Sequence, residues 1–512
     1  QTRRKMAVDL GIHIVVAVVV GILCLIGCGV FLIQYQHPDD RNAAWLPKII
    51  VLLGLFLACG VVLLLPFDAS LGQSCEDEPE CSVTAGMAQT WYFTFLSIGV
   101  MAFVLIPLAY FWYETDDEDG MGSRVCTTIC WSSVNLTVFV VFLTALYFTI
   151  GYVELPVVVM QPYATDDNVT VTSGFFDPGD PVPLWDDVEA ADTWDAIQQI
   201  RTSLVIYVLA LLSFVGWMLM TIFGGIGMVA LPMDLINSWY NRPVAIDVKQ
   251  WAERKLKLKS ECQRLLADGK SKQDELKANP SRWKERRFVN EFKKKVLDLE
   301  DEMEILNICY KKNAINPLVP WLQLFGGIFC WVVTISWWFQ LIFEIFLQGL
   351  AGPYLSDVFS RLSNAFPLFG IVAYGIFAFY ILVCVIKGSI KFAGRFFLIS
   401  IHPLKLNGTM MNSFLFNVGI ILICSVSATQ LCTTAFRQFV HSSAISQIFV
   451  TQIQYLKFFS YFYSMDVPVF YSLLFVVSFL QLIWSCCAVF VCAKKQADTI
   501  TDMMREARRE RV

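Results

Sequence analysis

Residues 204–232 read LVIYVLALLSFVGWMLMTIFGGIGMVALP, and the segment 232–317 that follows holds the densest run of Lys and Arg in the chain. The quoted stretch has no charged side chain and is longer than the roughly 20 helical residues that cross about 30 Å of hydrocarbon. The loop at 154–200, which precedes it, contains no Lys or Arg and is rich in Asp. Because cytosolic loops of membrane proteins collect Lys and Arg, the sequence predicts that 232–317 faces the cytosol and 154–200 faces away from it.

The composition is that of a membrane protein. The chain has 512 residues, of which 56% are hydrophobic and 16% charged, whereas a soluble domain has about 45–50% apolar and about 25% charged residues. The sequence predicts an all-α, polytopic protein with about nine transmembrane helices. The predicted spans are 8–34, 47–67, 89–112, 125–153, 201–231, 318–348, 364–388, 411–436 and 467–493. No basic patch is interleaved with base-stacking aromatic residues, so no nucleic-acid partner is expected.

An odd number of spans places the two termini on opposite sides of the membrane. The tail is basic and is predicted to be cytosolic, which leaves the N-terminus extracellular or lumenal, although Arg3, Arg4 and Lys5 oppose that orientation. The expected parts are a first bundle at 1–231 with outer loops at 68–88 and 154–200, a cytosolic segment at 232–317, a second bundle at 318–493 and a basic tail at 494–512. The protein is expected in the plasma membrane or in an endolysosomal or other internal membrane.

The cytosolic segment 232–317 carries apolar residues at the three- and four-residue steps of a helix. One stripe lies within 244–266 and the other within 282–310, and Gly269 and Pro280 lie between them. Each stripe needs a partner to leave water, so the sequence predicts two helices packed as an antiparallel coiled-coil hairpin. Its basic outer face suits a cytosolic protein or anionic lipid, and a merely solvated charged face is the alternative.

Most of the 16 cysteines lie in apolar spans, where a cysteine is usually a small buried hydrophobe. Cys75 and Cys81 instead flank an acidic stretch of a polar outer loop, so a disulfide is predicted, with two free thiols as the alternative. Asn168 begins an Asn-Val-Thr glycosylation sequon on the same side. The aromatic loop 154–200 either binds an extracellular ligand or packs on the rim of the membrane domain. No His/Cys cluster has zinc-site spacing, so neither a metal nor another cofactor is expected.

Several short motifs resemble the LIMR family of limb-region, lipocalin-receptor-like membrane proteins. They are QHPDD at 36–40, LLPFD at 64–68, FGGIG at 223–227, LP at 231–232, RP at 242–243, HPLK at 402–405 and MNSFLFNVG at 411–419. The resemblance covers nearly the whole chain and implies nine spans with a central coiled coil. It also implies a receptor or endocytic adaptor, with transport for some relatives, and no shared catalytic residues.

The residues of these motifs have physical roles of their own. Gly224, Gly225 and Gly227 permit close helix approach, and Pro232 is then expected to end the helix. A packing and turn element explains them better than a nucleotide-binding loop, which needs a following strand and helix. The sequence also contains His402, Pro403 and Lys405. A turn explains these three residues better than a site for a lipid headgroup does. The other helix-end positions are Pro66, Asp68 and Asp234.

Polar side chains inside the spans are functional candidates because each is costly in hydrocarbon. Glu344 in the sixth predicted span is the foremost, and Gln340 precedes it by one turn. Asn417 and Gln430 lie in the eighth span and Asn135 in the fourth. Each either lines a hydrated cavity or bonds between helices. For Glu344 a further alternative is an outer-interface position that its side chain reaches by snorkelling.

The sequence leaves two functions open. The first is a membrane receptor or adaptor for ligand uptake or membrane-protein trafficking, in which the loop 154–200 meets a ligand and the hairpin meets trafficking machinery. The second is a transporter or channel for a small molecule, ion or lipid, with a cavity lined by Glu344, Asn417 and Gln430. An enzyme is not expected, because the four histidines form no metal or nucleophile constellation. Membrane lipids are expected partners in either case, and the ligand and oligomeric state are not predicted.

Overall fold

The computed structural model describes residues 2–493 except 42–44, 75–81, 116–119, 161–192, 241, 243–247, 279–287, scattered positions between 290 and 308, 311–317, 348–353, 393, 397–398, 402–403, 407 and 464–467. Side chains at the start of the chain are described from Val15 onward. The chain divides into two compact units, Gln1–Gly225 with Trp337–Val477, and Ile226–Ser336 with Ser478–Val512. We call these the first and the second unit.

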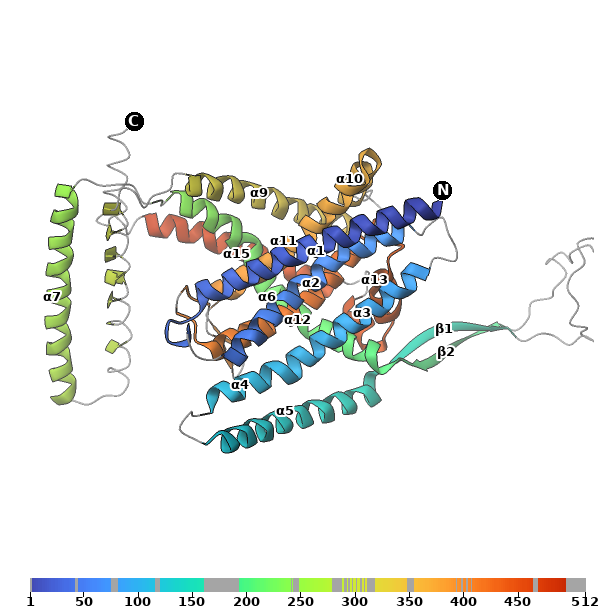
Figure 1. Cartoon of the computed structure of the whole chain (residues 1–512), viewed down its shortest axis with the longest axis horizontal. Coiled ribbons are helices and arrows are strands. Elements are labelled where there is room, and N and C mark those ends of the chain that lie inside the picture. The colour runs from blue at the N-terminus through green and yellow to red at the C-terminus, as the bar shows by residue number, and fades with distance from the viewer. Residues whose placement is uncertain are drawn as a thin grey trace, which may run out of the picture. The chain divides into compact units, whose positions relative to one another are not determined.

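Nine helical spans among the described residues are long and apolar enough to cross a membrane, which confirms the all-α, multi-pass class (Figure 1). Most are single helices: α1 Thr2–Tyr35, α2 Trp45–Ser74, α5 Met121–Ile150, α6 Leu204–Tyr240, α11 Pro367–Lys391, α12 Met411–Ala435 and α15 Val469–Ala493. Two include a π-helical turn: α3 Ser82–Val100 with Met101–Leu105 and α4 Ile106–Glu114, and α9 Leu318–Leu341 with Ile342–Phe346. Short helices are Asp39–Arg41, α10 Tyr354–Ala365, α13 Ala444–Ser446, Gln447–Ile453 and α14 Lys457–Tyr463.

The helix α12 forms the centre of the first unit, where it packs against α2, α4 and α11. Nearly all of its side chains are buried, and many are small or weakly polar, such as Ser425, Ser427 and Thr433. Small side chains let helix backbones approach closely. Gly216 of α6 is one point of contact, since a Cβ there would lie 2.6 Å from the carbonyl oxygen of Ile423. The centre of the bundle is therefore built by close backbone approach as much as by apolar bulk.

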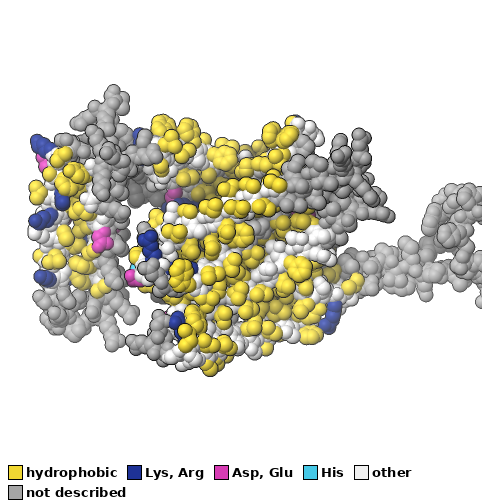
Figure 2. Space-filling view, viewed as in Figure 1, with side chains coloured by type: hydrophobic (Ala, Val, Ile, Leu, Met, Phe, Trp, Pro, Cys, Tyr) yellow, Lys and Arg dark blue, Asp and Glu magenta, His cyan; other side chains and the backbone are white. Residues whose placement is uncertain are grey.

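The outer helices of the first unit have the opposite character. Both α1 and α5 expose most of their apolar side chains, among them Leu23, Val138 and Val141. Apolar side chains cover most of the visible face of the membrane helices in Figure 2. An apolar surface this continuous is suited to lipid tails rather than to water.

Two prolines that were expected at helix ends lie inside helices. Pro66 is within α2, which continues to Ser74, and Pro232 is within α6, which continues to Tyr240. The expectation that Pro232 ends its helix is therefore wrong. Membrane helices tolerate an internal proline because neighbouring helices and local adjustments satisfy the backbone groups that it frees.

The glycines before Pro232 lie at close helix contacts. In the first unit, a Cβ on Gly225 would lie 2.8 Å from Cγ1 of Val477 in α15. Gly224 has looser surroundings, because a Cβ on Gly224 would lie 3.6 Å from Cγ2 of Val385 in α11. Gly227 and Asp234 lie in the part of α6 that belongs to the second unit.

Two antiparallel strand pairs interrupt the helical architecture. Strands β1 Tyr152–Met160 and β2 Thr193–Arg201 pair in a register that joins Tyr152 to Arg201 and Met160 to Thr193. A smaller pair consists of β3 Gly394–Phe396 and β4 Ile399–Ile401. Sequence reasoning did not anticipate the first ribbon, although the valines at 157–159 are the β-branched residues that strands favour.

The second unit contains α7 Val248–Ala278, which is longer than the predicted helix 244–266 and passes through Gly269. A Cβ on Gly269 would lie 2.7 Å from the ring of Phe292, so that glycine allows the aromatic side chain to pack on α7. Trp251 and Leu258 of α7 form a core with Leu299, Met303 and Leu306 of the second predicted stripe and with Cys309. The complete two-helix hairpin stays a prediction, because much of 279–317 lies outside the described residues.

Candidate functional site

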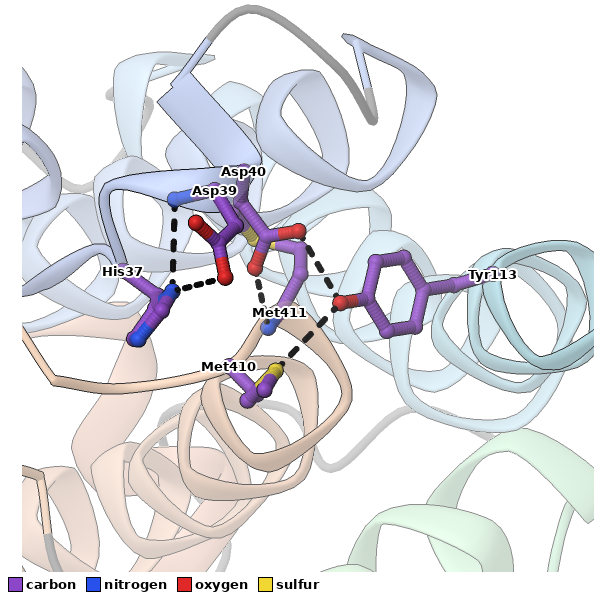
Figure 3. Close-up of polar contacts among 6 residues, drawn as sticks. All are labelled: His37, Asp39, Asp40, Tyr113, Met410 and Met411. Carbon is purple, nitrogen blue, oxygen red and sulfur yellow. Dashed lines mark hydrogen bonds and ion pairs between the residues drawn. The ribbon is translucent and has the colours of Figure 1, made fainter.

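Asp40, the last residue of the motif 36–40, bonds to the start of α12 (Figure 3). Its Oδ2 accepts a hydrogen bond from the backbone N–H of Met411 at 3.1 Å, and its Oδ1 accepts one from the hydroxyl of Tyr113 at 2.9 Å. The N-cap residue of α12, Met410, supplies no side-chain cap of its own. A carboxylate from a distant part of the chain therefore satisfies a free N–H group and meets the positive end of the helix dipole.

The rest of this motif is bound to the segment that precedes α12. The backbone N–H of His37 donates to the carbonyl oxygen of Thr409 at 3.0 Å, and the N–H of Thr409 donates to that of Tyr35 at 3.1 Å. Nδ1 of His37 lies 3.2 Å from the backbone nitrogen of Asp39 and 3.3 Å from its Oδ2. Thr409 also exchanges two hydrogen bonds of 2.8 Å with Lys405 through its hydroxyl. The motifs 36–40 and 402–405 thus belong to one interlocked turn, although His402 and Pro403 lie outside the described residues.

Asp68 of α2 is a second carboxylate that accepts hydrogen bonds from distant parts of the chain. Its Oδ2 accepts from the indole N–H of Trp91 and the backbone N–H of Ile445, both at 2.8 Å, and its Oδ1 accepts from the N–H of Ala444 at 3.1 Å. The residue is 1% exposed. A buried carboxylate is costly unless hydrogen bonds replace its hydration, and here three donors do so. Asp68 therefore joins α2, α3 and the start of α13.

Two glutamines inside the spans bond between helices. Oε1 of Gln430 in α12 accepts from Nε1 of Trp217 at 2.8 Å and from the hydroxyl of Ser213, both in α6. Nε2 of Gln340 in α9 donates to the carbonyl oxygen of Ala435 at 2.6 Å, and its Oε1 accepts from the N–H of Leu355 in α10 at 2.9 Å. Both glutamines are at most 2% exposed. These contacts connect α12 to α6 and α9, and α9 in turn to α10.

The other polar candidates of the spans have separate surroundings. Nδ2 of Asn417 donates to the carbonyl oxygen of Ser413, one turn earlier in α12, at 2.8 Å. Asn135 lies on an exposed face of α5. Glu344 is half-buried in the π-helical turn that follows α9. The sequence analysis assigned Glu344, Asn417 and Gln430 to one cavity. In the structure Asn417 bonds within α12, Gln430 bonds to α6, and Glu344 lies in the turn after α9.

An apolar cavity of about 330 Å³ lies elsewhere, between α1, α2 and α3. Its walls are Ala17, Val20, Gly21, Cys24, Phe56, Gly60, Leu63, Leu64, Phe67, Leu71 and Met87. Among the described residues, Cys24 with Cys28 and Cys59 is the group of side chains placed to hold a metal ion. The predicted disulfide Cys75–Cys81 and the sequon at Asn168 lie outside the described residues.

Sequence reasoning missed the partners of the motif residues. Tyr113 and Trp91, which donate to the two buried aspartates, carry no sequence signal beyond their position near the ends of apolar spans. The i, i+4 spacing of Cys24 and Cys28 was visible, but the approach of Cys59 depends on the packing of α1 on α2. The missing information was in each case a contact between helices.

The chain matches the family model described as LMBR1-like membrane protein over residues 13–314. A LIMR family protein of Dictyostelium discoideum is 35% identical over 477 residues, which cover 88% of this chain and 93% of that protein. A LIMR family protein of Oryza sativa subsp. japonica is 33% identical over 470 residues, 89% of this chain and 92% of that protein. A protein of Coccidioides immitis named probable lysosomal cobalamin transporter is 32% identical over 157 residues, 28% of this chain and 26% of its own. No solved structure matches the chain.

Proposed function

The chain belongs to the LIMR family of LMBR1-like membrane proteins, which confirms the resemblance of its motifs, and we propose that it is a membrane receptor or adaptor for ligand uptake or membrane-protein trafficking. The observation that carries this proposal is the set of hydrogen bonds around α12. Gln430 bonds to α6, and Gln340 bonds to the end of α12 and to α10. Polar side chains used in this way fix helix packing, whereas those of a transport path need contact with water or solute.

The two buried aspartates support the same conclusion. Asp40 holds the start of α12, and Asp68 holds the segment after its other end, where α13 begins. Alternating access moves one group of helices against another. A movement that separated α12 or α13 from the segments that carry Asp40 and Asp68 would break these buried hydrogen bonds, which contribute about 1.5–3 kcal/mol each. A bundle held in one arrangement suits a receptor that presents one binding surface on each side of the membrane.

Two peripheral parts of the chain are suited to such partners. Strands β1 and β2 project from the ends of α5 and α6 (Figure 1), and the segment 161–192 joins them. We assign ligand contact to this outer arm and trafficking contacts to α7, with the N-terminus outside and the tail in the cytosol. The basis for the orientation is the distribution of Lys and Arg, which are absent from 154–200 and dense in 232–317.

The proposal is tested by following the uptake of surface-labelled protein from intact cells. Three basic side chains of α7 are exposed: Lys257, Lys259 and Arg264. A Lys or Arg near an anionic surface contributes about 1 kcal/mol, so reversing all three charges to Glu is expected to slow internalisation by about tenfold or more. The matched control exchanges Lys for Arg and Arg for Lys at the same positions and is expected to internalise at the wild-type rate.

Two results of this experiment would contradict the proposal. One is internalisation at the wild-type rate in the charge-reversed variant, once equal surface amounts have been established by biotinylation. The other is that the labelled wild-type chain stays at the cell surface and is not internalised. Equal slowing in the charge-preserving control would also remove charge as the cause.

A second candidate function is transport of a small molecule. The observation that favours it is the partial similarity to the protein named probable lysosomal cobalamin transporter. The apolar cavity between α1, α2 and α3 offers space of about 330 Å³, but its walls carry no charged side chain that would recognise a polar solute. The receptor proposal is therefore preferred, and cobalamin flux into proteoliposomes above the rate of protein-free liposomes would favour the second candidate.

A further inference from the structure

Three cysteine thiols meet inside the membrane-spanning part of the first unit. Cys24 and Cys28 are one helical turn apart on α1, and Cys59 lies on α2. Their Sγ atoms all lie within 4.8 Å of one another. The four-residue spacing puts two thiols on one face of α1, and the packing of α1 on α2 adds the third. The hydrogen bonds around α12 involve none of these residues, so the cluster is independent of the proposed function.

The cavity beside Cys24 is lined by apolar side chains. Cys28 and Cys59 are each 7% exposed, and Cys24 is half-buried in the wall of the apolar cavity. None of the residues lining that cavity has a carboxylate, an imidazole or a hydroxyl group. Hard cations such as Mg²⁺ and Ca²⁺ require oxygen ligands, so this arrangement excludes them.

We propose that Cys24, Cys28 and Cys59 form a binding site for a soft monovalent metal ion, and that Cu(I) is the ion of best fit. Thiolate ligands select soft metals, and Cu(I) accepts a coordination shell made of sulfur alone. When one Cu(I) enters, the cysteines that bind it do so as thiolates, and each of them releases its proton to solvent. No electron is transferred, because the copper enters and remains as Cu(I).

Zn²⁺ fits the cluster less well. Zinc in proteins is almost always four-coordinate, and the fourth ligand would have to be a water molecule. An apolar cavity provides no further hydrogen-bond partners for such a water.

The proposal is tested on the purified full-length chain in detergent. The protein is loaded anaerobically with Cu(I) in the presence of a reductant, and copper is then measured after desalting against a Cu(I) chelator. We expect about one tightly held Cu(I) per chain, with sulfur as the only first neighbour in X-ray absorption spectra. We also expect the melting temperature of the chain to rise with Cu(I) and return when excess chelator removes the ion, because the metal binds the folded state.

Matched variants separate this site from the other cysteines. Cys59→Ala is expected to lower the Cu(I) affinity by about tenfold or more and to abolish the thermal shift. Cys384→Ala removes a buried cysteine of α11 outside the cluster and is expected to bind as the wild type does. Cys24→Ala is the second test variant, since its half-buried position makes misfolding a smaller concern.

Several outcomes would overturn the proposal. Copper held equally by wild type and by Cys24→Ala and Cys59→Ala would place the ligands elsewhere. Copper absent from folded, reduced wild-type protein would remove the site. The assignment to Cu(I) would be refuted if zinc bound the same thiols in preference to Cu(I) under competition. It would also be refuted by a disulfide within the cluster that survives the reductant.

Discussion

Replacing Asp68 with asparagine is expected to destabilise the first unit although it hardly changes the shape of the side chain. Oδ2 accepts from Trp91 and Ile445, and Oδ1 accepts from Ala444. The best orientation of the amide keeps its oxygen at the Oδ2 position and turns its NH₂ group toward the N–H of Ala444. The N–H of Ala444 then loses its acceptor, at a cost of about 1–3 kcal/mol. The new amide NH₂ group faces this N–H, and the repulsion between the two donors adds to the cost.

Asp68→Ala removes the acceptor of all three donors and is expected to cost about 3 kcal/mol or more. Trp91→Phe keeps an aromatic ring against Phe95 and removes only the indole N–H. In the Asp68→Ala background this second change should therefore cost less than it does in the wild type. The difference between the two costs measures the energy of the hydrogen bond.

Unfolding in graded SDS, followed by far-ultraviolet circular dichroism, supplies the free energies for this cycle. The matched control is Asp39→Asn, which makes the same chemical change on a carboxylate with an 82% exposed side chain and is expected to stay within about 0.5 kcal/mol of wild type. Equal stability of Asp68→Asn and Asp39→Asn would refute the reasoning. A Trp91→Phe cost that is the same in both backgrounds would show that no hydrogen bond joins Trp91 to Asp68.

Three further changes test other contacts of the first unit by the same unfolding measurement. Tyr113→Phe is expected to cost about 0.5–1.5 kcal/mol, because it deletes one hydrogen bond to Asp40, and it should cost little in an Asp40→Ala background. Gln430→Leu leaves two buried donors of α6 without their acceptor and is expected to cost about 2 kcal/mol or more; stability equal to wild type would contradict the contact. Gly388→Ala should destabilise strongly, because its Cβ would overlap the carbonyl group of Phe223, whereas Gly27→Ala meets open space and should be tolerated.

The sequence was sufficient for the class of fold because membrane crossing is a local property. A run such as 204–232 shows by its own length and lack of charge that it spans the bilayer. Helix continuation through Pro232 was mispredicted for a related reason: the rule that proline ends helices is weaker in a membrane, where other helices satisfy the freed groups. Local pattern therefore gives the spans and misjudges their ends.

The contacts that build the candidate site depend on tertiary packing and were only partly visible. Asp68 and Gln430 stood out as polar residues near or inside apolar runs, but Asp68 bonds to residues 376 and 377 positions away. No periodicity links positions that far apart. Cys59 poses the same problem, since its approach to Cys24 and Cys28 appears only when α1 packs on α2. Asp68 and Gln430 were identified as candidates from sequence, the cysteine cluster was not, and the partners of all of them required the fold.

The most direct test of a bundle without a water path is the chemical accessibility of α12. In Gln430→Cys, a membrane-impermeant thiol reagent is applied to both faces of sealed and opened vesicles, and modification of that peptide is quantified by mass spectrometry. Lys270→Cys, at an exposed position of α7, serves as the reactive control. A static receptor bundle predicts that the cysteine at 430 stays unmodified while the cysteine at 270 reacts. Rapid modification at 430 in folded protein would mean that water reaches the centre of the bundle, and it would favour a transporter.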